Sequence, residues 1–161
     1  MPKEMPDNAL EALGRGVDIT GYVVTDYAGD QITCWSNTGI LIFFNSAPII
    51  WPSKRQSTIE SSTFGSEFIA LKTALEILMV LQYKLRMMGV PINRPAYIFG
   101  DNMILVNVVY IPQCNFFKKH LGVCYHAVQE TSADGIWSVG FVKGKYNIAY
   151  FLTKIISVTT K

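Results

Sequence analysis

The acidic side chains best placed to do chemistry stand where ordered elements are expected to begin or end. The hexapeptide YIFGDN (97–102) reads as a buried strand that stops at a glycine, with Asp101 and Asn102 at its exit. Asp26 follows another β-rich run, and Glu67 lies near the start of the longest helical pattern. Carboxylates that converge in this way can hold Mg²⁺, which prefers oxygen ligands. Two such ions would activate water against a phosphodiester, so the pattern makes metal-assisted hydrolysis one chemistry open to this chain.

Each of these acids also has a purely structural interpretation. Asp and Asn favour turns and helix N-caps, so Asp101 could simply open the next segment. Glu67, expected in the first turn of its helix, could complement the helix dipole, which contributes about 0.3–1 kcal/mol. Because Glu67 also falls at the edge of the apolar stripe of that helix, the residues themselves leave both interpretations open.

The elements expected to position these acids alternate between strands and helices. The β-rich runs predict strands at 17–24, 39–44, 48–51, 96–100 and 136–141. Apolar periodicity predicts helices at 63–88, 102–110, 118–131 and 147–156, and residues 53–58 read as a polar connector. The order indicates a mixed α/β layer that begins with an antiparallel meander and continues through a crossover. Residues 1–16 are expected to form a flexible leader before a single domain at 17–161.

Composition narrows the class of protein. The 161 residues are 50% hydrophobic and 16% charged, which argues against disorder. The net charge of +2 permits a nucleic-acid partner without requiring one. The three cysteines lack metal-ligand spacing, and with no signal peptide the chain is expected inside the cell, in the cytoplasm or nucleus, with reduced thiols. Residues 31–53 carry no charge but are too interrupted by polar residues to span a membrane.

Several motifs, in a fixed order, resemble one protein family. They are SKRQSTIESSTFGSEFIALKTA, YKLRMMGVPI, FGDN, KKHLGVCYH and NIAYFLTK, within residues 17–156. Together they resemble the RNase H domain of a copia-type LTR retrotransposon Pol polyprotein. The resemblance implies an RNase H-like fold, a five-stranded mixed sheet with flanking helices. It also implies Mg²⁺-dependent cleavage of the RNA strand of RNA·DNA hybrids by four acids.

The resemblance places only two of those four acids in this chain. The helix Glu of the family falls on Glu67 and the strand-end Asp falls on Asp101, so these two are the implied catalytic and metal-binding residues. The other two acid positions hold Val24 and Tyr150. Asp26 is a possible substitute, because it lies two residues beyond Val24 on the same strand face. It is displaced by about 6.5 Å along the strand, however, which is large beside a metal–oxygen distance of about 2.1 Å.

Other departures remove charge from the expected nucleic-acid surface. An Arg-Arg-Ser motif of the family is Cys34-Trp35-Ser36 here, and a basic position is Gln129. Basic side chains remain that could contact phosphates, although each could equally be solvated surface: Lys54, Arg55, Lys118, Lys119, Lys143 and Lys145, with His126 a possible neighbour of the site.

Three hypotheses therefore stand. The chain is a degenerate RNase H domain with little or no catalysis, or a live enzyme that uses Asp26. The third possibility is a non-catalytic nucleic-acid-binding or structural module of a transposon polyprotein. The partners these imply are an RNA·DNA hybrid or other nucleic acid and the reverse transcriptase portion of the same element.

Overall fold

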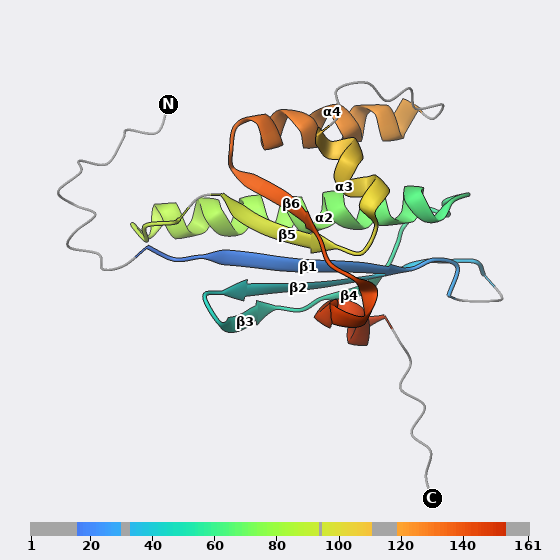
Figure 1. Cartoon of the computed structure of the whole chain (residues 1–161), viewed down its shortest axis with the longest axis horizontal. Helices are drawn as coiled ribbons and strands as arrows, with labels where there is room; N and C mark the ends of the chain where they lie inside the picture. Colours follow the sequence, from blue (N-terminus) through green and yellow to red (C-terminus); the bar gives the residue numbers. More distant parts are fainter. Residues whose placement is uncertain (1–15, 30–32, 94, 111–118, 154–161) are drawn as a thin grey trace, which may run out of the picture.

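The fold is seen in a computed structural model that describes residues 16–29, 33–93, 95–110 and 119–153 (Figure 1). Six strands form one sheet: β1 (Ile19–Asp26), β2 (Asn37–Phe44), β3 (Ala47–Ile50), β4 (Ser53–Arg55), β5 (Ala96–Gly100) and β6 (Trp137–Phe141). The helices are α2 (Thr63–Met87), α3 (Met103–Tyr110) and α4 (Lys119–Ala133), followed by the 3₁₀ helices η1 (Gly144–Tyr146) and η2 (Ile148–Leu152).

The sheet is mixed, in the strand order β3-β2-β1-β5-β6, and β4 pairs with β2. β1, β2 and β3 pair antiparallel as a meander, whereas β5 is parallel to both β1 and β6. The crossover from the meander to β5 runs through α2, as a parallel connection requires. Because β1 and β5 pair only from Thr20 to Tyr22 and from Tyr97 to Phe99, their carboxyl ends diverge beyond this register.

The core lies between one face of the sheet and the helices. Alternate residues of β1, such as Ile19 and Val23, point into this core because side chains alternate between the two faces of a strand. They join one cluster with residues of α2, α3 and α4, including Phe68, Leu71, Leu105 and Tyr125. Figure 1 shows α2 running along the sheet, with α3 and α4 stacked towards β6.

The opposite face of the sheet receives η2. A Cβ atom at Gly39 of β2 would lie only 2.8 Å from the Leu152 Cβ atom, so η2 packs directly on this glycine. Val24 is the cross-strand partner of Gly39 and therefore shares its face. Consecutive residues of β1 therefore face opposite sides of the sheet, one side towards the helical core and the other towards η2.

The predicted mixed α/β sheet is confirmed, but the count of five strands is wrong. The missed strand is β4, which lies in the stretch interpreted as a polar connector. Its three residues are all exposed and pair through their backbone with residues 37–39, so no hydrophobic pattern marks them.

The helix predicted at 147–156 is observed in the described part as one short 3₁₀ helix, η2, and η1 lies before the predicted range. Asn147, which is buried, separates the two 3₁₀ helices, and its Oδ1 atom accepts a hydrogen bond from the Ala149 N–H at 3.1 Å that caps the start of η2. The proposed leader, apart from Gly16, and residues 154–156 lie outside the described residues. No helix in the described ranges combines the length and apolar character needed to cross a membrane.

Candidate active site

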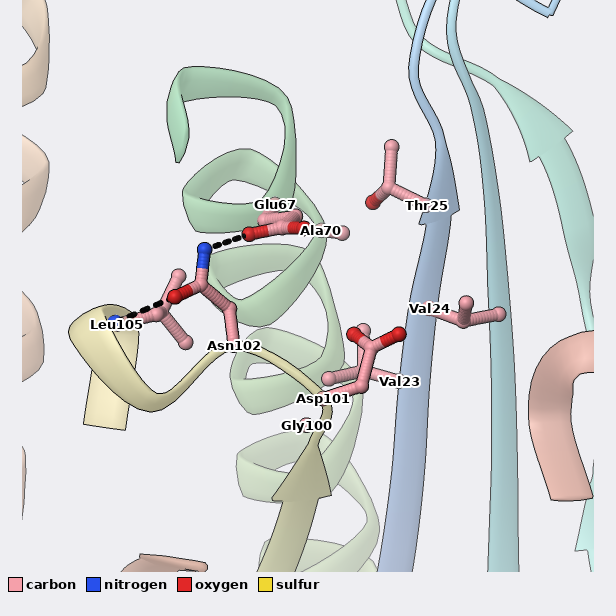
Figure 2. Close-up of a pocket in the computed structure, with 9 residues that line it drawn as sticks. All are labelled: Val23, Val24, Thr25, Glu67, Ala70, Gly100, Asp101, Asn102 and Leu105. Carbon is pink, nitrogen blue, oxygen red and sulfur yellow. Dashed lines mark hydrogen bonds between the residues drawn. The ribbon is translucent and has the colours of Figure 1, made fainter. Parts of the chain in front are cut away.

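The divergence of β1 from β5 opens a small pocket at the carboxyl ends of these strands. Ligand sites of open α/β sheets commonly lie at such a point. The pocket measures about 10 Å³, which is roughly the space of one water molecule. It is lined by Val23, Val24, Thr25, Glu67, Ala70, Gly100, Asp101, Asn102 and Leu105 (Figure 2). Two of the three acids considered in the sequence analysis therefore lie at one site, Glu67 from α2 and Asp101 from the exit of β5.

Asn102 joins the two sides of this pocket. Its Nδ2 atom donates a hydrogen bond to the Glu67 Oε2 atom. Its Oδ1 atom accepts from the backbone N–H groups of Ile104 and Leu105, at 2.8 and 3.3 Å, and so caps the start of α3. The capping role considered for Asp101 is therefore performed by its neighbour, and the Asp101 carboxylate is left at the pocket.

Glu67 stands one turn further into α2 than its dipole interpretation requires. The helix begins at Thr63 and has no acidic residue in its first turn. Ser62 caps it, its Oγ atom accepting a hydrogen bond from the Gly65 N–H at 3.1 Å. The structural explanation for Glu67 loses its basis, because the dipole effect fades beyond the first turn.

Both acids are harder to ionise than in water. Burial raises the pKa of Glu67; the hydrogen bond from Asn102 opposes this rise, and the nearby Asp101 charge adds to it. Burial also raises the pKa of Asp101. A hydrogen bond between its carboxylate and its own backbone lowers this pKa, but by less. When two half-buried carboxylates lie side by side, the charge of each disfavours ionisation of the other, and a bound positive charge would favour it.

Asp101 also borders a second and larger cleft, of about 770 Å³. Its carboxylate faces Gly144, where a Cβ atom would lie 3.5 Å from the Asp101 Oδ2 atom. Tyr150 lines the same cleft, on η2. Asp101 thus stands between the pocket that contains Glu67 and the cleft that contains Tyr150.

Val24 and its neighbours on β1 divide between the two faces of the sheet. In Figure 2 the side chains of Val23 and Thr25 point towards the α2 side, whereas Val24 points away from it. The Thr25 Oγ1 atom is buried and has no hydrogen-bond partner among the residues that the structure describes. Sequence reasoning missed this hydroxyl, since a threonine in a β-rich run is ordinary strand composition.

Asp26 does not join the two acids in the pocket. Its carboxylate folds back against Gly29, in the turn that follows β1, and Asp26 is not among the residues that line the pocket. Asp26 pairs with Asn37 on β2, and Asn37 in turn pairs with Arg55 on β4. Asp26, Asn37 and Arg55 thus form a row across three strands at the end of the sheet where β1 terminates.

No family model matches the chain. Two Arabidopsis thaliana relatives, the retrovirus-related Pol polyproteins from transposons RE1 and RE2, are each 25% identical over 91% and 89% of this chain. The chain spans only 10% of the length of each.

Solved structures of RNase H1 proteins share the fold. LC11-RNase H1, isolated from compost, matches over 84% of this chain and 91% of its own, with a TM-score of 0.63 and 16% identity. Its crystal structure in complex with an RNA/DNA hybrid matches 81% of this chain and 89% of its own, with a TM-score of 0.61 and 14% identity. RNase H1 from Halobacterium salinarum matches 81% of this chain and 89% of its own, with a TM-score of 0.56 and 14% identity.

The chain is a homologue of retrotransposon Pol polyproteins and has an RNase H-like fold.

Glu67 and Asp101 are the acidic residues that line the small pocket of this RNase H-like domain. Among its described residues, no three His, Cys, Asp or Glu side chains gather closely enough to hold a metal ion. Glu67, Asp101 and Thr25 line a pocket whose volume of about 10 Å³ is that of roughly one water molecule. The residues present therefore do not fit two bridged metal ions, whose charges need several carboxylates to offset them.

The basic residues of the RNase H-like domain fall into separate groups. Lys54 and Arg55 lie exposed on β4, where the Arg55 guanidinium stacks 5.0 Å from the centre of the Trp35 ring. Lys119 is the first residue of α4, and His126 is exposed on the same helix. This helix packs near β6, which is the edge strand on the opposite side of the sheet from β4. Lys118 lies outside the described residues. The groups on β4 and on α4 therefore lie towards opposite edges of the sheet.

Proposed function

We propose that this RNase H-like domain binds RNA·DNA hybrids and does not cleave them. The observation that carries the proposal is the content of the site, where Glu67 and Asp101 adjoin one pocket. The other two acid positions implied by the resemblance hold Val24, which has no ligand atom, and Tyr150, which offers a phenol oxygen in place of a carboxylate.

The size of the expected catalytic loss follows from transition-state arithmetic. Hydrolysis by two Mg²⁺ ions depends on the ions clamping the attacking and leaving oxygens of the phosphodiester. Losing about 5–6 kcal/mol of transition-state stabilisation slows a reaction roughly 10⁴-fold. Removing two of four metal ligands is expected to cost at least this much, so that cleavage falls below detection.

Binding requires less of the site than cleavage does. An RNase H1 with this fold has been crystallised with an RNA/DNA hybrid. Lys54 and Arg55 remain exposed on β4, and Arg55 belongs to the row of residues at the exit of β1. Phosphate contacts by such side chains give affinity that does not depend on sequence and weakens with salt.

The test is a labelled RNA·DNA hybrid incubated with the full chain in Mg²⁺ and, separately, in Mn²⁺. We expect binding, measured by fluorescence anisotropy, that weakens as salt rises, and no cleavage above background. The double variant Val24→Asp/Tyr150→Asp is expected to regain some cleavage, and adding Asp101→Asn to it should abolish what was regained.

Each alternative has a different outcome in the same assay. Cleavage by the unmodified chain that is lost in both Asp26→Asn and Asp101→Asn would show a live enzyme. A hybrid neither bound nor cut would favour a structural module, held beside the reverse transcriptase portion of a longer polyprotein.

A further inference from the structure

The cleft next to Asp101 is lined by aromatic side chains that the fold leaves uncovered. It is formed by the segment 144–151, and Tyr146, Tyr150 and Phe151 line it. Tyr146 is 61% exposed and Phe151 is 73% exposed. Large aromatic side chains are usually mostly buried, so two on one short segment suggest a surface that contacts something else.

The backbone beneath these rings is firmly anchored. Asn147 is buried, and its Nδ2 atom donates a hydrogen bond to the Val23 carbonyl at 2.8 Å, across to β1. Ala149 is fully buried, and η2 packs against Gly39 of β2. In Figure 1 this orange-to-red segment lies against the sheet beside β4. The exposed rings are therefore held by a rigid support, which limits the entropy lost when a ligand binds.

Positive charge accompanies the rings. Lys143 and Lys145 are both exposed; Lys143 immediately precedes η1 and Lys145 lies within it. The Lys145 Nζ atom lies 4.6 Å from the centre of the Tyr146 ring, in a cation–π contact. A ligand that suits this surface combines flat rings with negative charge at short intervals.

We infer that the segment 143–151 is a binding platform for single-stranded nucleic acid. Tyr146 and Phe151 stack unpaired bases, and Lys143 and Lys145 contact the phosphates between them. A duplex does not suit the platform, because its base faces are already stacked on one another. The inference is argued from different side chains than the proposed hybrid binding, which rests on Lys54 and Arg55 of β4, although both involve the cleft that Asp101 borders.

The test is the affinity of the full chain for a fluorescently labelled oligothymidylate of about 12 nucleotides, within the usual range of such sites. We expect the double variant Tyr146→Ala/Phe151→Ala to bind at least about tenfold more weakly, since each stacked base contributes roughly 1–3 kcal/mol. Tyr83→Ala removes an equally exposed ring from α2 and should bind as the unmodified chain does. Lys145→Gln should reduce the salt dependence of binding.

Circular dichroism of each variant first verifies that it is folded. An affinity that is unchanged in the Tyr146→Ala/Phe151→Ala variant, or that falls equally in Tyr83→Ala, would overturn the inference, as would an unmodified chain that does not bind oligothymidylate. Hybrid binding is titrated in parallel with the same proteins. If hybrid binding fails while oligothymidylate binding behaves as expected, the proposed function falls and the platform remains.

Discussion

Asp101 and Asn102 are neighbours in the chain with separate roles in the fold. Asn102 satisfies the first backbone N–H groups of α3 and holds Glu67, whereas Asp101 borders both the small pocket and the aromatic cleft. An amide suits the position of Asn102 because it can donate one hydrogen bond and accept another at the same time. An ionised carboxylate can only accept.

Replacing Asn102 should separate its two roles. Asn102→Ala removes the cap, which is expected to lower the free energy of unfolding by about 1 kcal/mol. It also removes the hydrogen bond to Glu67, so its loss should be larger at pH 7 than at pH 4. Asn102→Asp keeps the cap but places a third carboxylate beside Glu67, so its loss should be larger at pH 7 than at pH 4, where carboxylates become protonated. Urea unfolding at the two pH values measures both. An equal loss for Asn102→Asp at both pH values would contradict the contact with Glu67.

The raised pKa values of Glu67 and Asp101 predict how stability depends on pH. A folded state that binds a proton more tightly than the unfolded state loses stability as pH rises from the ordinary carboxyl pKa through the raised value. Asp101→Asn should therefore stabilise the chain at pH 7, by on the order of 0.5 kcal/mol because solvent screens a half-buried group, and have little effect near pH 3. The exposed Glu130→Gln on α4 is the control. Thermal unfolding that shows no stabilisation at pH 7 would contradict the prediction.

At the scale of elements, the site exists because one strand contacts two layers. β1 presents Val23 to the helical core and Val24 to η2. The close approach of η2 depends on Gly39, which has no side chain to hold the 3₁₀ helix away from the sheet. A change at this glycine should therefore act on η2 and on the cleft that it forms.

Gly39→Ala is expected to lower the free energy of unfolding by about 1–3 kcal/mol, as overpacking generally does. The added Cβ atom would meet the Leu152 Cβ atom at 2.8 Å and the Ala149 carbonyl oxygen at 3.1 Å. The matched control is Gly122→Ala in α4, where no atom lies within 4 Å of the new Cβ atom. That control should stabilise by up to about 1 kcal/mol through helix propensity. Urea unfolding in which both variants behave alike would count against the packing of η2.

At the scale of the whole molecule, the sheet and the helices share one core. Trp137 of β6 is only 1% exposed within this cluster, while Trp51, just after β3, is 59% exposed. A single shared core predicts that no part of the described fold unfolds alone, because each layer supplies the apolar surface that the other buries.

Unfolding in urea is therefore expected to be two-state. The Trp35→Phe/Trp51→Phe variant removes the other two tryptophans of the chain, so that the fluorescence change reports on the buried Trp137. Its midpoint should coincide with the midpoint from far-UV circular dichroism, which reports on the helices. Two separate midpoints would indicate independent units and would contradict the shared core.

The sequence by itself determined the α/β order, the positions of five strands within a few residues, and the acidic exit of β5. These features are local, because apolar periodicity and the Gly-Asp-Asn exit of β5 depend on neighbouring residues. The short strand β4 escaped prediction because it is formed by backbone pairing with β2 and carries no apolar pattern.

Only the tertiary structure decided which side chains share a site. The turn after β1 draws the Asp26 carboxylate towards Gly29, and the cap of α3 assigns Asn102, not Asp101, to the helix. The cleft of Tyr146 and Phe151 forms because Asn147 ends one 3₁₀ helix, starts the next and bonds to β1. These three features depend on contacts between segments that are distant in the chain, or on the direction in which a side chain points. The spacing of residues along the sequence specifies neither the contacts nor the directions.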